Sequence, residues 1–332
     1  MRPLAPGILP ILLAILTLPT GSLGCLAGGP QISQQTSAQS KPQQEPAQKQ
    51  QEDTIHLSSR LVLVPVSASD SSGQPVKDLT PADITIEEDG RSQQVVSLGE
   101  PGKTPLEIAL LMDVSGSTQK QFSFEQQAAV QFIGDILKTN DAISLFSIAL
   151  TPQLVKTRTG SRDEAVAGLM SIRSSNEPTA FFDTIVDAAQ YLGKTADPNS
   201  RRVLVVISDG EENYSKSNKL DDALRELQKN DCLFYSINPS GEGIRLNKIS
   251  LRGQKFMEAL ALPTGGQAFN VARVENLESV FRQIAEELQA QYLFGYYSAD
   301  EHPAEGFKTI TVRASKRADL RIRARQGYYV RK

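Results

Sequence analysis

Two hydrophobic patterns alternate along the middle of the chain. Near-continuous apolar runs recur at 106–112, 142–149, 202–208 and 232–237, and each has the length of a buried strand. Between them, apolar residues return every three or four positions, which predicts amphipathic helices around 128–137, 185–192 and 277–288. Apolar strands that alternate with such helices predict an α/β fold, with a doubly wound, mostly parallel sheet covered on both faces.

The segments on either side of this core have the pattern of strands. Residues 83–87 alternate before the turn signal Asp89-Gly90, and residues 308–314 and 320–325 alternate near the other end. We expect an N-terminal β segment at 55–104, an α/β domain at 105–290 and a C-terminal β segment at 291–332. The simplest packing pairs the two β segments into one β-sandwich, and two separate small β units would give the same pattern. Arg321, Arg323 and Arg325 are expected on a solvated strand face, with an anionic binding surface as the alternative.

The N-terminal residues 1–27 have the pattern of an export signal. Arg2 precedes an apolar run at 8–18 that is too short to span a bilayer, and small residues follow from Gly21. Leu23-Gly24-Cys25 is similar to a lipobox, which would place a lipid on Cys25, whereas ordinary cleavage after Gly24 or Ala27 fits equally. Residues 28–54 are rich in Gln, Ser and Pro and predict a flexible tether. We expect an exported protein of the periplasm, cell envelope or extracellular space, which contacts a membrane only through that lipid.

Composition narrows the classes of function. The net charge of −3 over 332 residues gives no case for nucleic-acid binding, which is typical of strongly basic domains. His56 and His302 are the two histidines, so a Ser-His-Asp triad or a histidine zinc site is disfavoured. Cys232 lies in an apolar run and is expected to be a buried, inert thiol.

Oxygen-bearing side chains follow the ends of two predicted strands. Asp113, Ser115 and Ser117 form a DxSxS run after the first, and Asp209 follows the run at 203–206. Open α/β sheets bind ligands beyond the carboxyl ends of their strands, where Thr179 adds a hydroxyl from a loop. Such hard oxygen ligands suit a divalent cation. The competing interpretation is a helix cap and a turn, because Asp and Ser serve both.

Two groups of acidic residues lie close to these positions in the sequence. Asp183 comes one helical turn after Thr179, where it either supports a ligand or is solvated. Glu211 and Glu212 are expected in an exposed loop.

The five oxygen-bearing positions resemble the metal-ion-dependent adhesion site of the von Willebrand factor A family. That site joins a DxSxS motif, a loop threonine and a distant aspartate, and the resemblance covers roughly residues 104–290. The wider layout resembles the VWFA-related proteins first catalogued in Acidobacteria. The segments that carry this second resemblance are 75–83, 284–288, Gln291-Tyr292 and Gly327-Tyr328-Tyr329.

The resemblance implies a cation, most often Mg²⁺, with Mn²⁺ or Ca²⁺ as alternatives, and an open coordination position that a partner's Asp or Glu fills. One departure is Asn176-Glu177-Pro178, where many relatives carry glycines, and Glu177 would weaken an acidic partner or alter the loop. We therefore expect an exported, metal-dependent protein-binding module without catalysis. The alternatives are a structural envelope scaffold with an incidental metal and a metal-dependent hydrolase, for which no general base remains beside the ligands.

Overall fold

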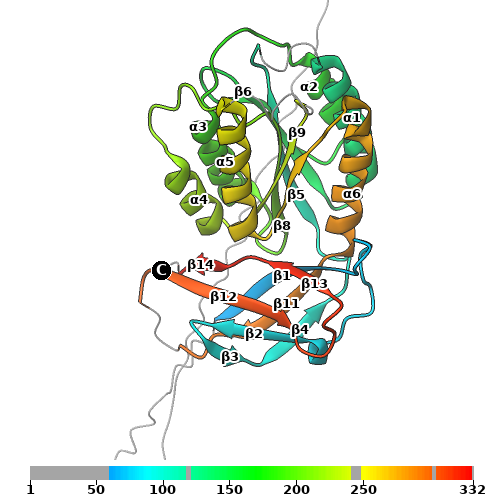
Figure 1. Cartoon of the computed structure of the whole chain (residues 1–332), viewed down its shortest axis with the longest axis vertical. Helices are drawn as coiled ribbons and strands as arrows, with labels where there is room; N and C mark the ends of the chain where they lie inside the picture. Colours follow the sequence, from blue (N-terminus) through cyan, green and yellow to red (C-terminus); the bar gives the residue numbers. More distant parts are fainter. Residues whose placement is uncertain (1–59, 117–120, 241–247, 301–303, 331–332) are drawn as a thin grey trace, which may run out of the picture. The chain divides into compact units, whose positions relative to one another are not determined.

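The computed structural model describes residues 60–116, 121–240, 248–300 and 304–330 (Figure 1). The predicted export signal, the tether, both histidines and Ser117 lie outside these ranges. Within them, no helix is both long and apolar enough to cross a bilayer.

A six-stranded sheet forms the centre of the α/β part, in the order β10-β9-β8-β5-β6-β7. Neighbouring strands are parallel except at one edge, where β7 runs antiparallel to β6. The four predicted apolar runs are confirmed as β5, β6, β8 and β9. The strands are β5 (Leu106–Asp113), β6 (Ala142–Ile148), β7 (Gln153–Thr159), β8 (Arg201–Ile207), β9 (Cys232–Asn238) and β10 (Ala268–Asn270).

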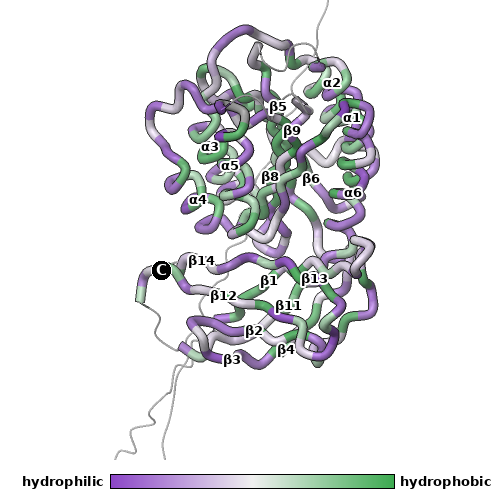
Figure 2. The backbone as a smooth tube through the Cα atoms, viewed as in Figure 1, coloured by the Kyte–Doolittle hydropathy of each residue, from purple (hydrophilic) through white to green (hydrophobic). Residues whose placement is uncertain are grey.

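Helices cover both faces of this sheet, as the sequence predicts. Ile108 and Leu110 of β5 pack with one group of helices and Ala109 and Leu111 with the other, because successive strand residues point to opposite faces. The apolar residues accordingly gather along the sheet and the inner faces of the helices (Figure 2). The first face carries α1 (Phe122–Ile136), α2 (Arg162–Ser171) and α6 (Leu277–Ala290); the second carries α3 (Phe181–Thr195), α4 (Leu220–Lys229) and α5 (Lys248–Thr264). A 3₁₀ turn, η3 (Val274–Asn276), precedes α6.

The two flanking segments pair with each other in two antiparallel four-stranded sheets. One sheet has the order β13-β1-β11-β4 and the other β14-β12-β2-β3. Val64, Ile86, Phe294 and Ile310 come from both sheets and share one core, which makes the two sheets a sandwich. The elements are β1 (Leu61–Ser69), η1 (Pro81–Asp83), β2 (Ile84–Glu88), β3 (Arg91–Gln93), β4 (Val95–Gly99), β11 (Tyr292–Tyr297), β12 (Phe307–Ala314), β13 (Arg321–Ala324) and β14 (Gly327–Tyr329).

Glu287 of α6 connects the α/β part to the sandwich. Its carboxylate accepts hydrogen bonds from the hydroxyls of Ser67, at 2.8 Å, and Tyr235, at 2.5 Å, and pairs with Arg323. One side chain thus joins the last helix to β1, β9 and β13. The expectation that Arg323 lies on a solvated face is wrong, because the guanidinium finds a nearly buried carboxylate opposite it.

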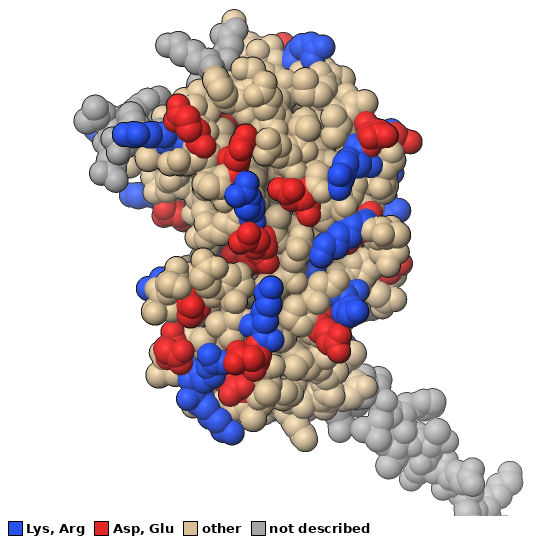
Figure 3. Space-filling model, turned by 90° about the vertical axis from the view of Figure 1, so that its right-hand side faces the viewer, with Lys and Arg blue, Asp and Glu red and all other residues tan. Residues whose placement is uncertain are grey.

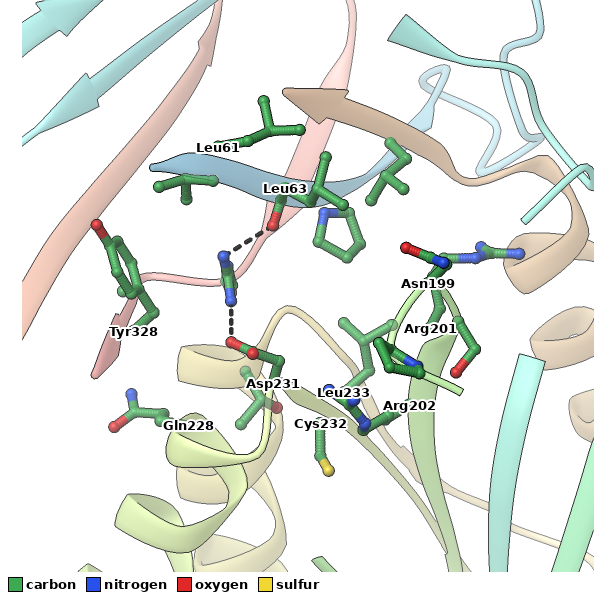
Figure 4. Close-up of a pocket in the computed structure, with 18 of the residues that line it drawn as sticks. Leu61, Leu63, Asn199, Arg201, Arg202, Gln228, Asp231, Cys232, Leu233 and Tyr328 are labelled. Atoms are coloured by element: carbon green, nitrogen blue, oxygen red, sulfur yellow. Dashed lines mark hydrogen bonds and ion pairs between the residues drawn. The ribbon is translucent and has the colours of Figure 1, made fainter. Parts of the chain in front are cut away.

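Arg325 also turns inward. It pairs with Asp231 and donates to the carbonyl oxygen of Leu63 at 2.7 Å, beside a cavity of about 180 Å³ that these residues line (Figure 4). Of the three arginines, Arg321 keeps the expected exposed position. On the face shown in Figure 3, basic and acidic side chains are interspersed.

Replacing Glu287 by Ala should remove three hydrogen bonds at once and leave Arg323 without its carboxylate. We expect the free energy of unfolding to fall by about 2–4 kcal/mol, because breaking a largely buried pair strands the remaining charge. Urea unfolding measures the change. Glu286→Ala is the matched control, since Glu286 is the exposed neighbour on the same helix, and an equal loss in both variants would contradict the role of Glu287.

Candidate metal centre

Asp113 ends β5 with its carboxylate completely buried, at 0% exposure. One carboxylate oxygen accepts the backbone N–H of Ser115 at 2.9 Å, and the other accepts the hydroxyl of Ser208 at 2.6 Å. The Ser208 hydroxyl in turn accepts the N–H of Gly210 at 2.9 Å. Donors from two different strand ends therefore fix the orientation of this carboxylate.

Asp209 lies on the neighbouring strand end. Strands β5 and β8 are parallel, with Met112 beside Ile207, so the residues that follow them emerge at the same sheet edge. Asp209 is 2% exposed, and one oxygen accepts the N–H of Glu211 at 3.0 Å. Burial, reinforced by the charge of Asp209, raises the pKa of Asp113 to about 6. The two carboxylates predicted to act together are thus close enough to repel each other.

Thr179 is buried in the loop between α2 and α3, and it is hydrogen-bonded to the loop that carries Asp209. Its hydroxyl donates to the carbonyl oxygen of Glu211 at 2.8 Å. Its own carbonyl oxygen accepts the N–H groups of Asn213, at 3.2 Å, and Tyr214, at 3.0 Å. Because the hydroxyl proton points to Glu211, the lone pairs of the Thr179 oxygen remain for a cation.

The DxSxS loop lies against the loop that precedes Thr179. The N–H of Ser175 donates to the carbonyl oxygen of Val114 at 2.5 Å. A Cβ atom on Gly116 would lie 3.0 Å from Oδ1 of Asn176, so the two loops approach each other closely. Ser115 is buried at this edge. The structure therefore brings together Asp113, Ser115, Thr179 and Asp209, while Ser117 lies outside the described residues.

Two acidic side chains hold the loops that surround the site. Glu212, expected to be exposed, accepts the N–H of Phe182 at the start of α3 and the hydroxyl of Ser215, at 3.1 and 2.6 Å. Asp183 accepts three backbone N–H groups, those of Lys216 and Asn218, each at 2.9 Å, and that of Ser217 at 3.4 Å. Both fix the loop after Asp209 to the helix after Thr179. The contacts between the loop and the helix join residues 30 to 35 positions apart in sequence, so no local pattern predicts them.

The side-chain oxygens that meet at this sheet edge fit a hard divalent cation. Carboxylate and hydroxyl oxygens are the ligands that Mg²⁺ and Ca²⁺ accept, and two buried carboxylates supply the opposing charge. Across the residues that the structure describes, no three Asp, Glu, His or Cys side chains converge closely enough to hold an ion by themselves. Hydroxyl oxygens would therefore have to complete the ligand set, as the sequence pattern proposes.

Gly210 and Gly253 set the position of the Asp209 backbone. Gly210 has a φ of +74°, a conformation that favours glycine, and a Cβ there would lie 2.6 Å from the carbonyl oxygen of Gly253. A Cβ on Gly253 of α5 would lie 2.4 Å from the carbonyl oxygen of Asp209. The loop therefore touches the helix backbone to backbone, with no room for a methyl group.

Gly253→Ala should push the Asp209 loop away from α5. We expect a loss of about 1–3 kcal/mol in unfolding free energy, because a methyl group cannot fit without moving backbone. Gly134→Ala is the matched control, since a Cβ at this helical glycine meets nothing within 4 Å, and it should stabilise by about 0.5–1 kcal/mol. Chemical denaturation of both variants measures the difference, and a neutral or stabilising Gly253→Ala would show that the contact is loose.

Several solved structures are similar to this chain at low identity. Proximal thread matrix protein 1 from the mussel byssus, in a form with a zinc-occupied MIDAS motif, is 12% identical at a TM-score of 0.49, over 61% of this chain and 50% of that one. BatB from Bacteroides thetaiotaomicron is 16% identical at a TM-score of 0.44, and the match covers 55% of this chain and 98% of BatB. The PilB minor pilin from Streptococcus sanguinis is 12% identical at a TM-score of 0.46, and the match covers 57% of this chain and 62% of the pilin.

No curated protein matches the chain. The sequence profile of the von Willebrand factor type A domain, by contrast, matches residues 107–283, which is more than half of the 332 residues. This range begins in β5 and ends in α6, so it contains all of the central sheet except Leu106, and all the described residues of the site. The chain belongs to the von Willebrand factor type A domain family.

Proposed function

We propose that this chain is a metal-dependent protein-binding module. Asp113, Ser115, Ser117, Thr179 and Asp209 would hold a divalent cation, with Mg²⁺ as the best fit and Mn²⁺ or Ca²⁺ as alternatives. A partner's Asp or Glu would fill the remaining coordination position. The observation that carries the proposal is the meeting of two buried carboxylates and the Thr179 hydroxyl at one sheet edge.

The family supports this class of function. Von Willebrand factor type A domains are commonly metal-dependent adhesion or protein-binding modules, and they are generally non-catalytic. The export signal and tether predicted at 1–54 would place such a module in the periplasm, cell envelope or extracellular space, with a lipid on Cys25 as one means of attachment. These placements rest on the sequence pattern alone.

Exposed apolar side chains surround the same sheet edge and indicate the chemistry of a partner. β7 and the helices α1 and α5 begin at this edge, because each follows a strand that ends on it. Helix α2 follows β7 from the opposite edge and therefore ends at this one. Large apolar residues at these positions are exposed, as they commonly are at interaction sites. They are Phe124, Leu154, Met170, Tyr214 and Leu251. A partner that presents an acidic residue between apolar ones would match this surface.

A structural scaffold with an incidental metal is the main alternative. A metal titration separates the two, because a cation that binds only the folded state raises its stability by mass action. At a cation concentration 100 times the dissociation constant, the gain is about 2.7 kcal/mol. We expect thermal melts to rise with Mg²⁺ or Mn²⁺ relative to EDTA in the wild-type chain, and to stay unchanged in Asp113→Ala and Thr179→Ala.

The control for these melts is Asp135→Ala, which removes an exposed carboxylate from α1 and should keep the full response to metal. A wild-type chain that shows no metal-dependent rise at millimolar concentrations would favour the scaffold. Turnover of ester or phosphate substrates that depends on Asp113 and Asp209 would instead indicate the hydrolase.

Selection of peptides tests the binding function directly. A displayed random peptide library, bound in Mg²⁺ and eluted with EDTA, should be enriched in sequences with Asp or Glu beside apolar residues. The same selection with Asp113→Ala should yield no such enrichment. Peptides that elute with EDTA yet lack acidic residues would contradict the proposed coordination by a partner carboxylate.

A further inference from the structure

Glu125 in the first turn of α1 is buried without a hydrogen-bond partner. The residue is 0% exposed, and neither carboxylate oxygen has a partner among the described residues. Two other glutamates are buried among the described residues, and both have hydrogen-bond or ion-pair partners. Glu88 accepts from the hydroxyls of Tyr296, Ser298 and Tyr328, and Glu107 pairs with Arg158. Burying a carboxyl group without a partner lowers the stability of the folded state, so the presence of Glu125 here needs a physical reason.

The position of Glu125 relates it to the metal centre. Helix α1 follows the DxSxS loop, and the stripe of α1 that contains Glu125 packs in the core that also holds Met112 and Val114, the two neighbours of Asp113. Burial first, and then the charges of Asp113 and Asp209, raise the pKa of Glu125 to about 9. The side chain is therefore within electrostatic reach of both aspartates that are proposed as ligands.

We propose that Glu125 is a third carboxylate of the cation site and acts on the cation through its charge. The inference rests on the proposed function. Since no three acidic side chains converge closely enough to hold an ion directly in the described parts of the chain, Glu125 is a positioning residue rather than a ligand. A bound divalent cation would favour the ionised form of Glu125 and offset the repulsion among the three carboxylates, at a side chain for which the described residues supply no hydrogen-bond partner. The cation would then be held firmly before any partner arrives.

Calorimetric titration of the chain with Mg²⁺ alone, and then Mn²⁺ alone, tests this role. Glu125→Gln keeps the shape and removes the charge, so we expect the affinity for either cation to fall by about tenfold to 100-fold, the range for residues that act through a ligand. In EDTA, the same variant should melt at or above the wild-type temperature, because a lone buried carboxyl is gone. A residue that only fills space would leave metal affinity unchanged.

Three further variants keep the test decisive. Glu125→Asp retains the charge and should recover most of the affinity, whereas Glu125→Met should lose as much as Glu125→Gln. Glu107→Gln is the matched control, because it removes a buried carboxylate near the opposite end of β5, and it should lower stability without changing metal affinity. Wild-type affinity in both Glu125→Gln and Glu125→Met would overturn the inference and leave the proposed function standing. A wild-type chain that binds neither cation would overturn the proposed function itself.

Discussion

Two carboxylates buried at one edge of a sheet are the constraint on which the rest of the site depends. Asp113 and Asp209 have almost no contact with solvent, and each charge disfavours the other. The surrounding loops donate hydrogen bonds to these carboxylates. The donors are the hydroxyl of Ser208 and backbone N–H groups of the DxSxS loop and of the loop after β8. Such an arrangement holds two acid groups that disfavour each other's charge in fixed positions, which is the physical case for a cation.

Much of this architecture is predictable from periodicity. Strands buried on both faces read as continuous apolar runs, and the parallel order places Asp113 and Asp209 at one edge before any coordinates are known. The contacts that hold the site are not predictable in this way, because Ser208, Glu212 and Gly253 meet partners that are distant in sequence. The expectation of a solvated Arg323 fails for the same reason, because strand alternation does not reveal that α6 supplies the carboxylate of Glu287.

Glu125 is a case in which the sequence contained a signal. It lies three and four positions before Ala128 and Ala129, on the apolar stripe of α1, where a charged residue contradicts the periodicity. Acidic residues are also common in the first turn of a helix, which makes the position easy to read as exposed. The structure decides between the two interpretations. Glu125 is buried, so it faces the interior and is not an exposed residue that only complements the helix dipole.

The register of the sandwich sets how the chain would bear a mechanical load. β1 enters its sheet at Leu61, opposite Tyr297, whereas β11 enters at Tyr292, opposite Val66, and continues directly from α6. A force that held the N-terminal side of β1 and pulled through α6 would act on opposite ends of the antiparallel pair. The hydrogen bonds between the strands would then be loaded in shear, all together, rather than opened one at a time. Because the α/β part is inserted in the chain between β1 and β11, a pull on it would load this strand pair. The resistance of the pair to force would be set by its rate of unfolding.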